Sequence, residues 1–276
     1  MARKLFQASL LAAMALSIGA FPGTAQWLHY PTSGVPKNPD GSPNLQAPAP
    51  RTADGHPDFS GLWEPIKNRP CPPEGCDDIQ VPWEFINIGW SLKDGLPFQP
   101  WAAELKRKRQ ENYSMDDPAS NCLPIGIVKS HTAPLLKKAM QVPGLLIILY
   151  ERGVTYRQIF TDGRKFPDDM MPTWNGYSTG RWDGDTLVVE TRGFRDDGWL
   201  DRSGSPMTAD AKITERFRRV NFGRLEIDLT VDDPKAYTHP WTVMLTHRLA
   251  LDTDLLDYVC LENEKDLQHI PKPGAQ

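Results

Sequence analysis

From residue 145 onward the chain consists of short segments in which apolar residues either alternate with polar ones or form brief apolar runs. In residues 224–232, Leu225, Ile227, Leu229 and Val231 alternate with charged residues and threonine. A period of two is typical of a strand with one buried face. Together the segments predict about eight strands, at residues 145–151, 154–161, 177–182, 186–191, 213–220, 224–232, 241–249 and 255–260.

The connections between these segments favour an antiparallel arrangement. Asp183-Gly184-Asp185 and Asn221-Phe222-Gly223 are turn sequences that predict hairpins. Almost no helical pattern separates the strands, which argues against a parallel α/β sheet. Because closure removes exposed edges, we expect a mainly β, antiparallel, lipocalin-like barrel of about eight strands, wide enough for one small ligand. A two-sheet sandwich is the alternative.

The N-terminal half has a different pattern. Residues 26–57 are rich in proline, glycine, asparagine and serine and predict an extended arm. A first strand is expected near residues 58–63, which opens a single barrel domain spanning 58–276. Residues 65–143 predict an irregular and helical insertion with one long helix starting at Pro100, because proline suits the first helical turn.

Residues 1–25 predict a signal peptide. Arg3 and Lys4 precede an apolar run that ends near small residues suited to cleavage, and an uncleaved membrane anchor is the alternative. No later segment predicts a membrane span, so a periplasmic or secreted bacterial protein is expected. The formal charge of −4 offers no basic surface for nucleic acid. The sequence leaves the oligomeric state open.

Four cysteines in an exported chain favour two disulfides. Cys71 and Cys76 bracket a tight Pro-Pro-Glu-Gly turn, which leaves Cys122 and Cys260 for a second bridge. A zinc site is the alternative reading, but only one short-spaced cysteine pair exists and no histidine lies near it. No metal site and no organic cofactor are predicted.

Residues 156–204 predict a small-molecule site, because this stretch is too polar for a core and too aromatic for an ordinary surface. Aromatic rings supply contact area in such a site, and charges orient the bound molecule. The expected ligand-binding residues are Trp174, Tyr177, Trp199, Arg164 and Arg181.

Acid–base chemistry is the reaction type that these residues favour. Asp168, Asp201 and Glu215 escape the Asp-Gly turn pattern of the other candidate carboxylates, and two carboxyl groups in different environments can act as acid and base. Arg157 lies on a predicted strand, where a fixed guanidinium can hold an anionic group. We therefore predict these four residues as catalytic; internal ion pairs are the simpler alternative for each.

Two further features of the sequence bear on catalysis. Gly176-Tyr177-Ser178-Thr179-Gly180 matches the Gly-x-Ser-x-Gly pattern of serine hydrolases, but a predicted hairpin follows it instead of the helix that the mechanism needs. His131 lies before the first long apolar strand and is a possible general base, although a loop histidine with a structural role is the more common case.

Several motifs resemble those of an uncharacterised family of exported bacterial proteins. They are Asp-Phe-Ser-Gly-Leu-Trp at 58–63, Gly-Arg-Trp-Asp-Gly-Asp-Thr-Leu at 180–187 and Asp-Asp-Pro-Lys-Ala-Tyr at 232–237. Members of that group often have histidine where this chain has Met207, which weakens any histidine mechanism at that position. Gly61-Leu62-Trp63 is also similar to the start of lipocalin barrels, which implies an apolar or aromatic ligand in the barrel.

The sequence thus predicts an exported enzyme that acts on a small, partly apolar or glycosylated molecule by acid–base chemistry, as a lyase, isomerase or hydrolase. A lipocalin-like binding protein without catalysis is the alternative, and an envelope interaction module that docks through the N-terminal arm is a third. Two carboxylates about 6–9 Å apart at an open cavity would favour catalysis. A closed apolar cup would favour binding.

Overall fold

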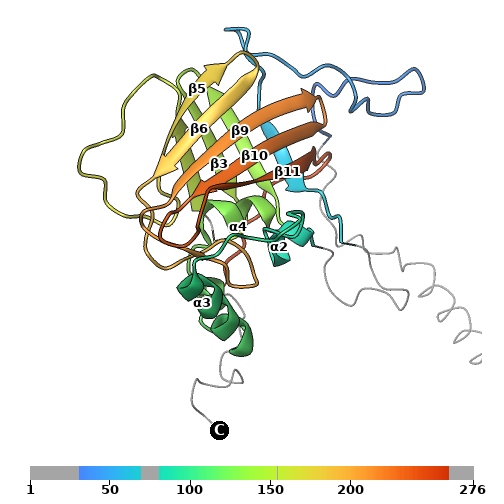
Figure 1. The fold of residues 1–276 in the computed structure, drawn as a ribbon. Helices are drawn as coiled ribbons and strands as arrows, with labels where there is room; N and C mark the ends of the chain where they lie inside the picture. Colours follow the sequence, from blue (N-terminus) through green and yellow to red (C-terminus); the bar gives the residue numbers. More distant parts are fainter. Residues whose placement is uncertain (1–30, 70–80, 154, 261–276) are drawn as a thin grey trace, which may run out of the picture.

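A closed β-barrel of nine strands forms the body of the protein in a computed structural model, which describes residues 31–69, 81–153 and 155–260 (Figure 1). The strands follow one another around the barrel in the order β1-β11-β10-β9-β6-β5-β4-β3-β2, and β1 closes it by pairing with both β11 and β2. Their bounds are β1 Gly61–Pro65, β2 Lys137–Val142, β3 Leu145–Tyr150, β4 Thr155–Phe160, β5 Tyr177–Asp183, β6 Thr186–Arg192, β9 Lys212–Asn221, β10 Arg224–Asp232 and β11 Trp241–Leu249.

The mainly β barrel is confirmed, but three details of the predicted strand pattern are wrong. The barrel has nine strands, because β2 (Lys137–Val142) forms inside the stretch expected to be irregular and helical up to residue 143. Residues 255–260 form no barrel strand, only a bridge between Tyr258 and Arg152. The sheet is also mixed, since β4 and β5 are parallel; after the long connection over residues 161–176, the first residues of β5 pair with Ile159 and Phe160 at the end of β4.

Alternating side chains from every strand fill the barrel interior. On β10, Leu225, Ile227, Leu229 and Val231 are buried, as the period of two predicts, and the residues between them are more exposed. Trp63, Phe217, Leu146, Ile159 and Leu187 are among the largest fully buried side chains. The interior is therefore largely a packed core.

Helices and loops cover one end of the barrel (Figure 1). The helix predicted from Pro100 is present as α3 (Pro100–Glu111), and the short helices α2 (Trp83–Ile86) and η1 (Pro118–Asn121) flank it in the chain. The sequence did not predict α4 (Gly126–Thr132), which lies across the end of the barrel. Six of its residues are buried, among them Lys129 and His131. This helix therefore carries polar side chains into the protein interior.

The N-terminal arm contacts the barrel at several points. Thr32 and Asp252 exchange two hydrogen bonds, and Arg51 forms an ion pair with Asp185 in the β5–β6 turn. His56 stacks on Trp182 with 4.2 Å between the ring centroids. These contacts attach the arm to the barrel region at Thr32, Arg51 and His56. Between β6 and β9 the chain adds a small two-stranded sheet of β7 (Gly198–Trp199) and β8 (Pro206–Met207).

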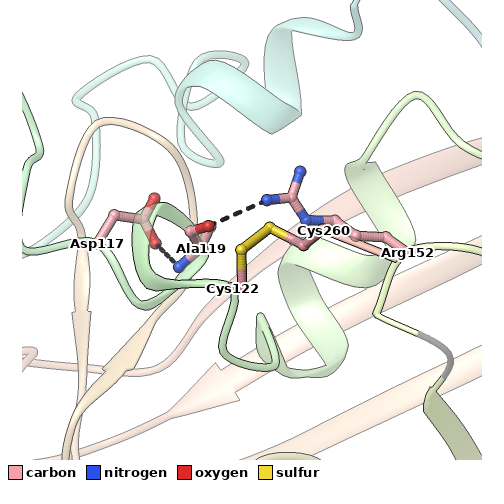
Figure 2. The surroundings of a disulfide bond; sticks show 5 residues. All are labelled: Asp117, Ala119, Cys122, Arg152 and Cys260. Atoms are coloured by element: carbon pink, nitrogen blue, oxygen red, sulfur yellow. Dashed lines mark hydrogen bonds between the residues drawn. A yellow bond between two sulfur atoms is a disulfide. The ribbon is translucent and has the colours of Figure 1, made fainter. Parts of the chain in front are cut away.

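The predicted disulfide between Cys122 and Cys260 is present, with 5.5 Å between the two Cα atoms. Figure 2 shows it beside η1, where Arg152 donates a hydrogen bond to the carbonyl oxygen of Ala119. The bridge thus ties the chain after the last barrel strand to the segment that leads into α4. The predicted Cys71–Cys76 bridge and signal peptide lie outside the described residues. Within the described ranges, no helix is both long and apolar enough to cross a bilayer.

Removing the Cys122–Cys260 bridge should destabilise the fold strongly, since it joins positions 138 residues apart. The chain-entropy model gives such a loop a contribution of about 4–5 kcal/mol. We expect the double variant Cys122→Ser, Cys260→Ser to lower the free energy of unfolding by about this amount in urea titrations. An unchanged unfolding midpoint would show that the bridge does not constrain the unfolded chain.

Candidate functional site

A buried ion pair between Arg157 and Glu215 lies at the centre of the candidate site. Arg157 is on β4, opposite Ile148 of β3, and Glu215 is on β9 between Val189 and Leu229 of the neighbouring strands. Both side chains point into the barrel, because they share the parity of the buried apolar residues on their strands. Their side chains are 1% and 0% exposed.

The guanidinium of Arg157 donates four hydrogen bonds to side chains inside the barrel. Its two terminal nitrogens donate to the two carboxylate oxygens of Glu215, one of them at 3.0 Å. The remaining donors reach Ser178 on β5 at 3.1 Å and Thr191 on β6 at 2.8 Å. A two-point contact of this kind fixes the direction of the carboxylate as well as its charge. Ser178, the serine of the hydrolase-like motif, is therefore a support for Arg157.

His131 enters this network from α4. Its Nε2 lies 2.8 Å from a carboxylate oxygen of Glu215. A carboxylate only accepts hydrogen bonds, so Nε2 carries the proton and donates. The other ring nitrogen, Nδ1, is buried and has no hydrogen-bond partner among the described residues. Glu215 thus holds the ring in the tautomer that leaves a free lone pair on Nδ1.

Lys137 and His247 hold the backbone beside His131. The ammonium nitrogen of Lys137, on β2, donates to the carbonyl oxygen of His131 at 2.7 Å, and Nε2 of His247, on β11, donates to the same oxygen at 2.8 Å. The last carbonyl oxygens of a helix have no hydrogen-bond partner within the helix. Here Lys137 and His247 both donate to one of them, the carbonyl oxygen of His131. His247 therefore also carries its proton on Nε2, and its Nδ1 has no partner in the described part of the chain.

The electrostatics of the cluster keep both imidazoles neutral. Burial lowers the pKa of His131 in spite of the nearby carboxylate, and burial lowers the pKa of His247 still further. Burial also lowers the pKa of Lys137 to about 7. For Glu215 burial acts in the opposite direction, but the charge of Arg157 and the hydrogen bond from His131 prevail and lower its pKa to about 2.

Two cavities adjoin the histidines. An outer pocket with about 130 Å³ of space for water lies between the end of β1, α2 and β11, and its walls include Asn68, Glu84, Thr132, His131 and His247. An inner cavity of about 20 Å³ lies inside the barrel, where His131, Lys137 and His247 meet an apolar wall. About 10–15 Å³ of such space holds one water molecule. The outer pocket therefore accepts a small molecule, and the inner cavity only a few atoms.

Of the four predicted catalytic residues, the structure brings Arg157 and Glu215 together. Asp201 is fully buried elsewhere and accepts hydrogen bonds from the backbone of Ile88 and Ser205 and from two serine hydroxyls. Asp168 is exposed and lines an open groove on the surface. Neither aspartate makes a hydrogen bond with the Arg157–Glu215 pair, so the geometry gives Glu215 no partner carboxylate from this set.

The predicted ligand-binding residues lie away from the ion pair. Trp174 and Trp199 line a common narrow crevice, where the guanidinium of Arg195 lies over Trp174 and that of Arg109 over Trp199. Tyr177 stacks on Phe160, Arg164 pairs with Asp162, and Arg181 is exposed on β5. Their role in ligand binding stays a prediction.

His247 and Lys137 were missed by sequence reasoning. His247 shares the inward parity of Trp241, Val243 and Leu245 along β11, so the period of two was a usable signal for a buried histidine. Lys137 gave no comparable signal, because its strand was not predicted. His131 was named only as a possible base, and its placement depends on α4.

No protein-family model matches the chain, and no curated protein matches it at a significant level. Within the described ranges, no group of three or more histidine, cysteine, aspartate or glutamate side chains is placed to hold a metal ion. The Nδ1 atoms of His131 and His247 are nitrogens of this site that are buried without a hydrogen-bond partner among the described residues. The chemistry of the site is therefore inferred from its own geometry.

The ion pair should make stability depend on pH in acid. The pKa of Glu215 is about 2 in the folded protein and 4.5 ordinarily, so the stabilisation is complete above pH 4.5 and is lost as the pH falls toward 2. This loss is on the order of 3 kcal/mol. The pKa values of His131 and His247 are lower in the folded protein than in the unfolded chain. The unfolded chain therefore binds more protons below pH 6.5, and this causes a further loss of stability.

Urea unfolding at pH 7, 5.5, 4 and 3 measures both losses. In Glu215→Gln the free energy of unfolding should fall less between pH 4.5 and 3 than in the parent. The variant should also be less stable than the parent at pH 7, because Arg157 loses its counter-charge. Parallel pH curves for the two proteins would contradict the assignment.

Proposed function

We propose that this protein is an exported enzyme that acts on a small, partly apolar molecule by acid–base chemistry, with His131 as the residue that transfers the proton. One observation carries the proposal. The imidazole of His131 is buried, Glu215 orients it from one side, and the Nδ1 atom on the other side has no partner in the described residues while the ring lines a pocket. A polar atom left unpaired in a protein interior costs stability, so its presence at a pocket favours a functional role.

The geometry supports a general base. Neutral His131 accepts a proton on Nδ1 from a molecule in the outer pocket, and the carboxylate of Glu215 stabilises the imidazolium that forms. Arg157 limits this stabilisation, because it already neutralises Glu215. The resulting imidazolium is therefore a strong acid that returns its proton readily. A base that takes and returns one proton suits a lyase or an isomerase.

Hydrolysis of a glycoside has less support. That reaction ordinarily needs two carboxyl groups flanking one bond. The other buried carboxylates of the described chain, Asp117, Asp201 and Asp233, are satisfied by partners other than those of Glu215. We therefore place the lyase or isomerase reaction ahead of the hydrolase.

A lipocalin-like binding protein without catalysis remains the second proposal. The closed barrel supports it, and the Cys122–Cys260 bridge suits an oxidising compartment in either case. The packed interior offers only about 20 Å³, however, so a ligand would have to bind in the outer pocket and not in a deep cup.

A deuterium-exchange screen tests the enzymatic proposal. The full mature protein is incubated in D₂O with a panel of small hydroxy acids, aldehydes, ketones and unsaturated acids, and proton NMR detects exchange at carbon or new products. For any compound that reacts, His131→Gln should lower the rate by about 10²-fold or more, since positioned proton transfer contributes roughly 10²–10⁴.

His239→Gln is the matched control, because His239 is exposed in the loop between β10 and β11. It should leave the rate unchanged. Rates are compared only for variants with the same circular dichroism spectrum as the parent. A folded His131→Gln variant with the parent's rate would reject His131 as the base. Binding without exchange or turnover of any compound that binds would favour the second proposal.

A further inference from the structure

Lys137 is a buried lysine without a carboxylate partner. It is one of two buried lysines in the described part of the chain. The other, Lys129, forms an ion pair with Asp117 at 2.5 Å. Lys137 donates only to backbone carbonyl oxygens, that of His131 at 2.7 Å and that of Ser130 at 3.4 Å. A buried ammonium without a counter-ion is costly, and proteins avoid that cost by shifting the group toward its neutral form.

The surroundings of Lys137 favour the neutral amine. It lines the inner cavity together with His131 and His247, and the rest of the wall is apolar, with Phe59, Trp63 and Phe217 among its members. Burial lowers the pKa of Lys137 to about 7, so a large share of the molecules carry the free amine at neutral pH. A desolvated lysine in a hydrophobic pocket is the form in which this residue acts as a nucleophile.

We propose that Lys137 forms an imine with small aldehydes or ketones, which makes carbonyl compounds the substrate class of the site. This inference rests on the proposed acid–base function and deepens it. Two neutral imidazoles at the same cavity supply the proton transfers that imine chemistry requires.

The reaction balances without any other reagent. The lone pair of Nζ attacks the carbonyl carbon, a carbon–nitrogen bond forms, and the carbonyl π electrons move to oxygen. One proton passes from nitrogen to that oxygen. A second proton, which the Nδ1 of a neighbouring histidine took from the ammonium form of Lys137 before the attack, passes to the same oxygen and releases it as water, leaving a protonated carbon–nitrogen double bond and a neutral histidine. The protonated imine then acidifies hydrogens on the adjacent carbon, and Nδ1 of His131 takes one of them. Water reverses the sequence and frees Lys137.

The two cavities limit the size of the carbonyl compound. His131 and His247 line both the outer pocket and the inner cavity, so a compound that enters from the outer pocket would reach Lys137 by a path beside these rings. The outer pocket holds about 130 Å³ and the inner cavity about 20 Å³. A short aldehyde fits this path, and a bicyclic aromatic aldehyde does not.

Reductive trapping tests the proposal. The full mature protein is incubated with propionaldehyde at pH 7, reduced with sodium borohydride, digested and mapped by fragmentation mass spectrometry. Lys138 is the built-in reference, because it is adjacent in sequence but partly exposed and paired with Asp254. We expect about tenfold or more label on Lys137 than on Lys138 in the parent protein, since burial lowers the pKa of Lys137 to about 7 and leaves much of its amine unprotonated at this pH.

Three comparisons decide the outcome. The label on position 137 should vanish in Lys137→Arg, persist in Lys138→Arg, and be absent when 2-naphthaldehyde replaces propionaldehyde. Label spread over exposed lysines, with none enriched on Lys137 of the parent, would overturn the inference. This result is obtained on the parent protein alone and does not require any variant to fold.

The two proposals can fail separately. If Lys137 is unlabelled while His131→Gln still abolishes turnover, imine formation is wrong and the proposed acid–base function stands. If Lys137 is labelled selectively but His131→Gln leaves turnover unchanged, the carbonyl site stands and His131 is not its base.

Discussion

The buried ion pair between Arg157 and Glu215 joins β4 to β9 inside the barrel and links both strands to α4 through His131. Two charges removed from water cost several kcal/mol each, and that cost is recovered only where the geometry is good and every remaining donor and acceptor is satisfied. Ser178 and Thr191 meet that requirement for the guanidinium, and His131 meets it for the carboxylate. The contact with His131 also attaches α4 to the end of the barrel. Loss of either charge should leave the other uncompensated, at a cost of about 3–5 kcal/mol.

The same pair gives the cluster its chemical character. Replacing a buried ion pair by apolar residues is often neutral or stabilising, so its presence in a packed barrel is weak evidence for a purely structural role. In this barrel it fixes the tautomer of His131, while the carbonyl of His131 fixes the tautomer of His247. The result is two neutral imidazoles and a lysine of lowered pKa around one small cavity. Such a group of bases suits proton transfer better than passive binding.

Sequence patterns predicted the parts of this arrangement that depend on local periodicity. The period of two places Leu225 to Val231 inside the barrel, and the same parity selects Arg157 and Glu215 as inward charges. The period of two could not predict contacts between residues that are distant in sequence. His131 and Glu215 are 84 residues apart, and His247 and His131 are 116 apart. Asp201 resembled a catalytic acid in the sequence, but its neighbouring serines and the backbone of residue 88 satisfy it. No local pattern distinguishes such a carboxylate from one that faces a cavity.

The proposed role of His131 requires that its ring is neutral, with the proton on Nε2 and a free lone pair on Nδ1. Nitrogen-15 NMR of the histidine rings at pH 7 measures this directly, because the two ring nitrogens of a neutral imidazole resonate apart according to which one is protonated. We expect His131 and His247 both to show a protonated Nε2 and an unprotonated Nδ1, and neither ring to become protonated at the ordinary histidine pKa of about 6.5, because burial lowers the pKa of both. A protonated Nδ1 on His131, or an imidazolium at pH 7, would contradict the proposed role.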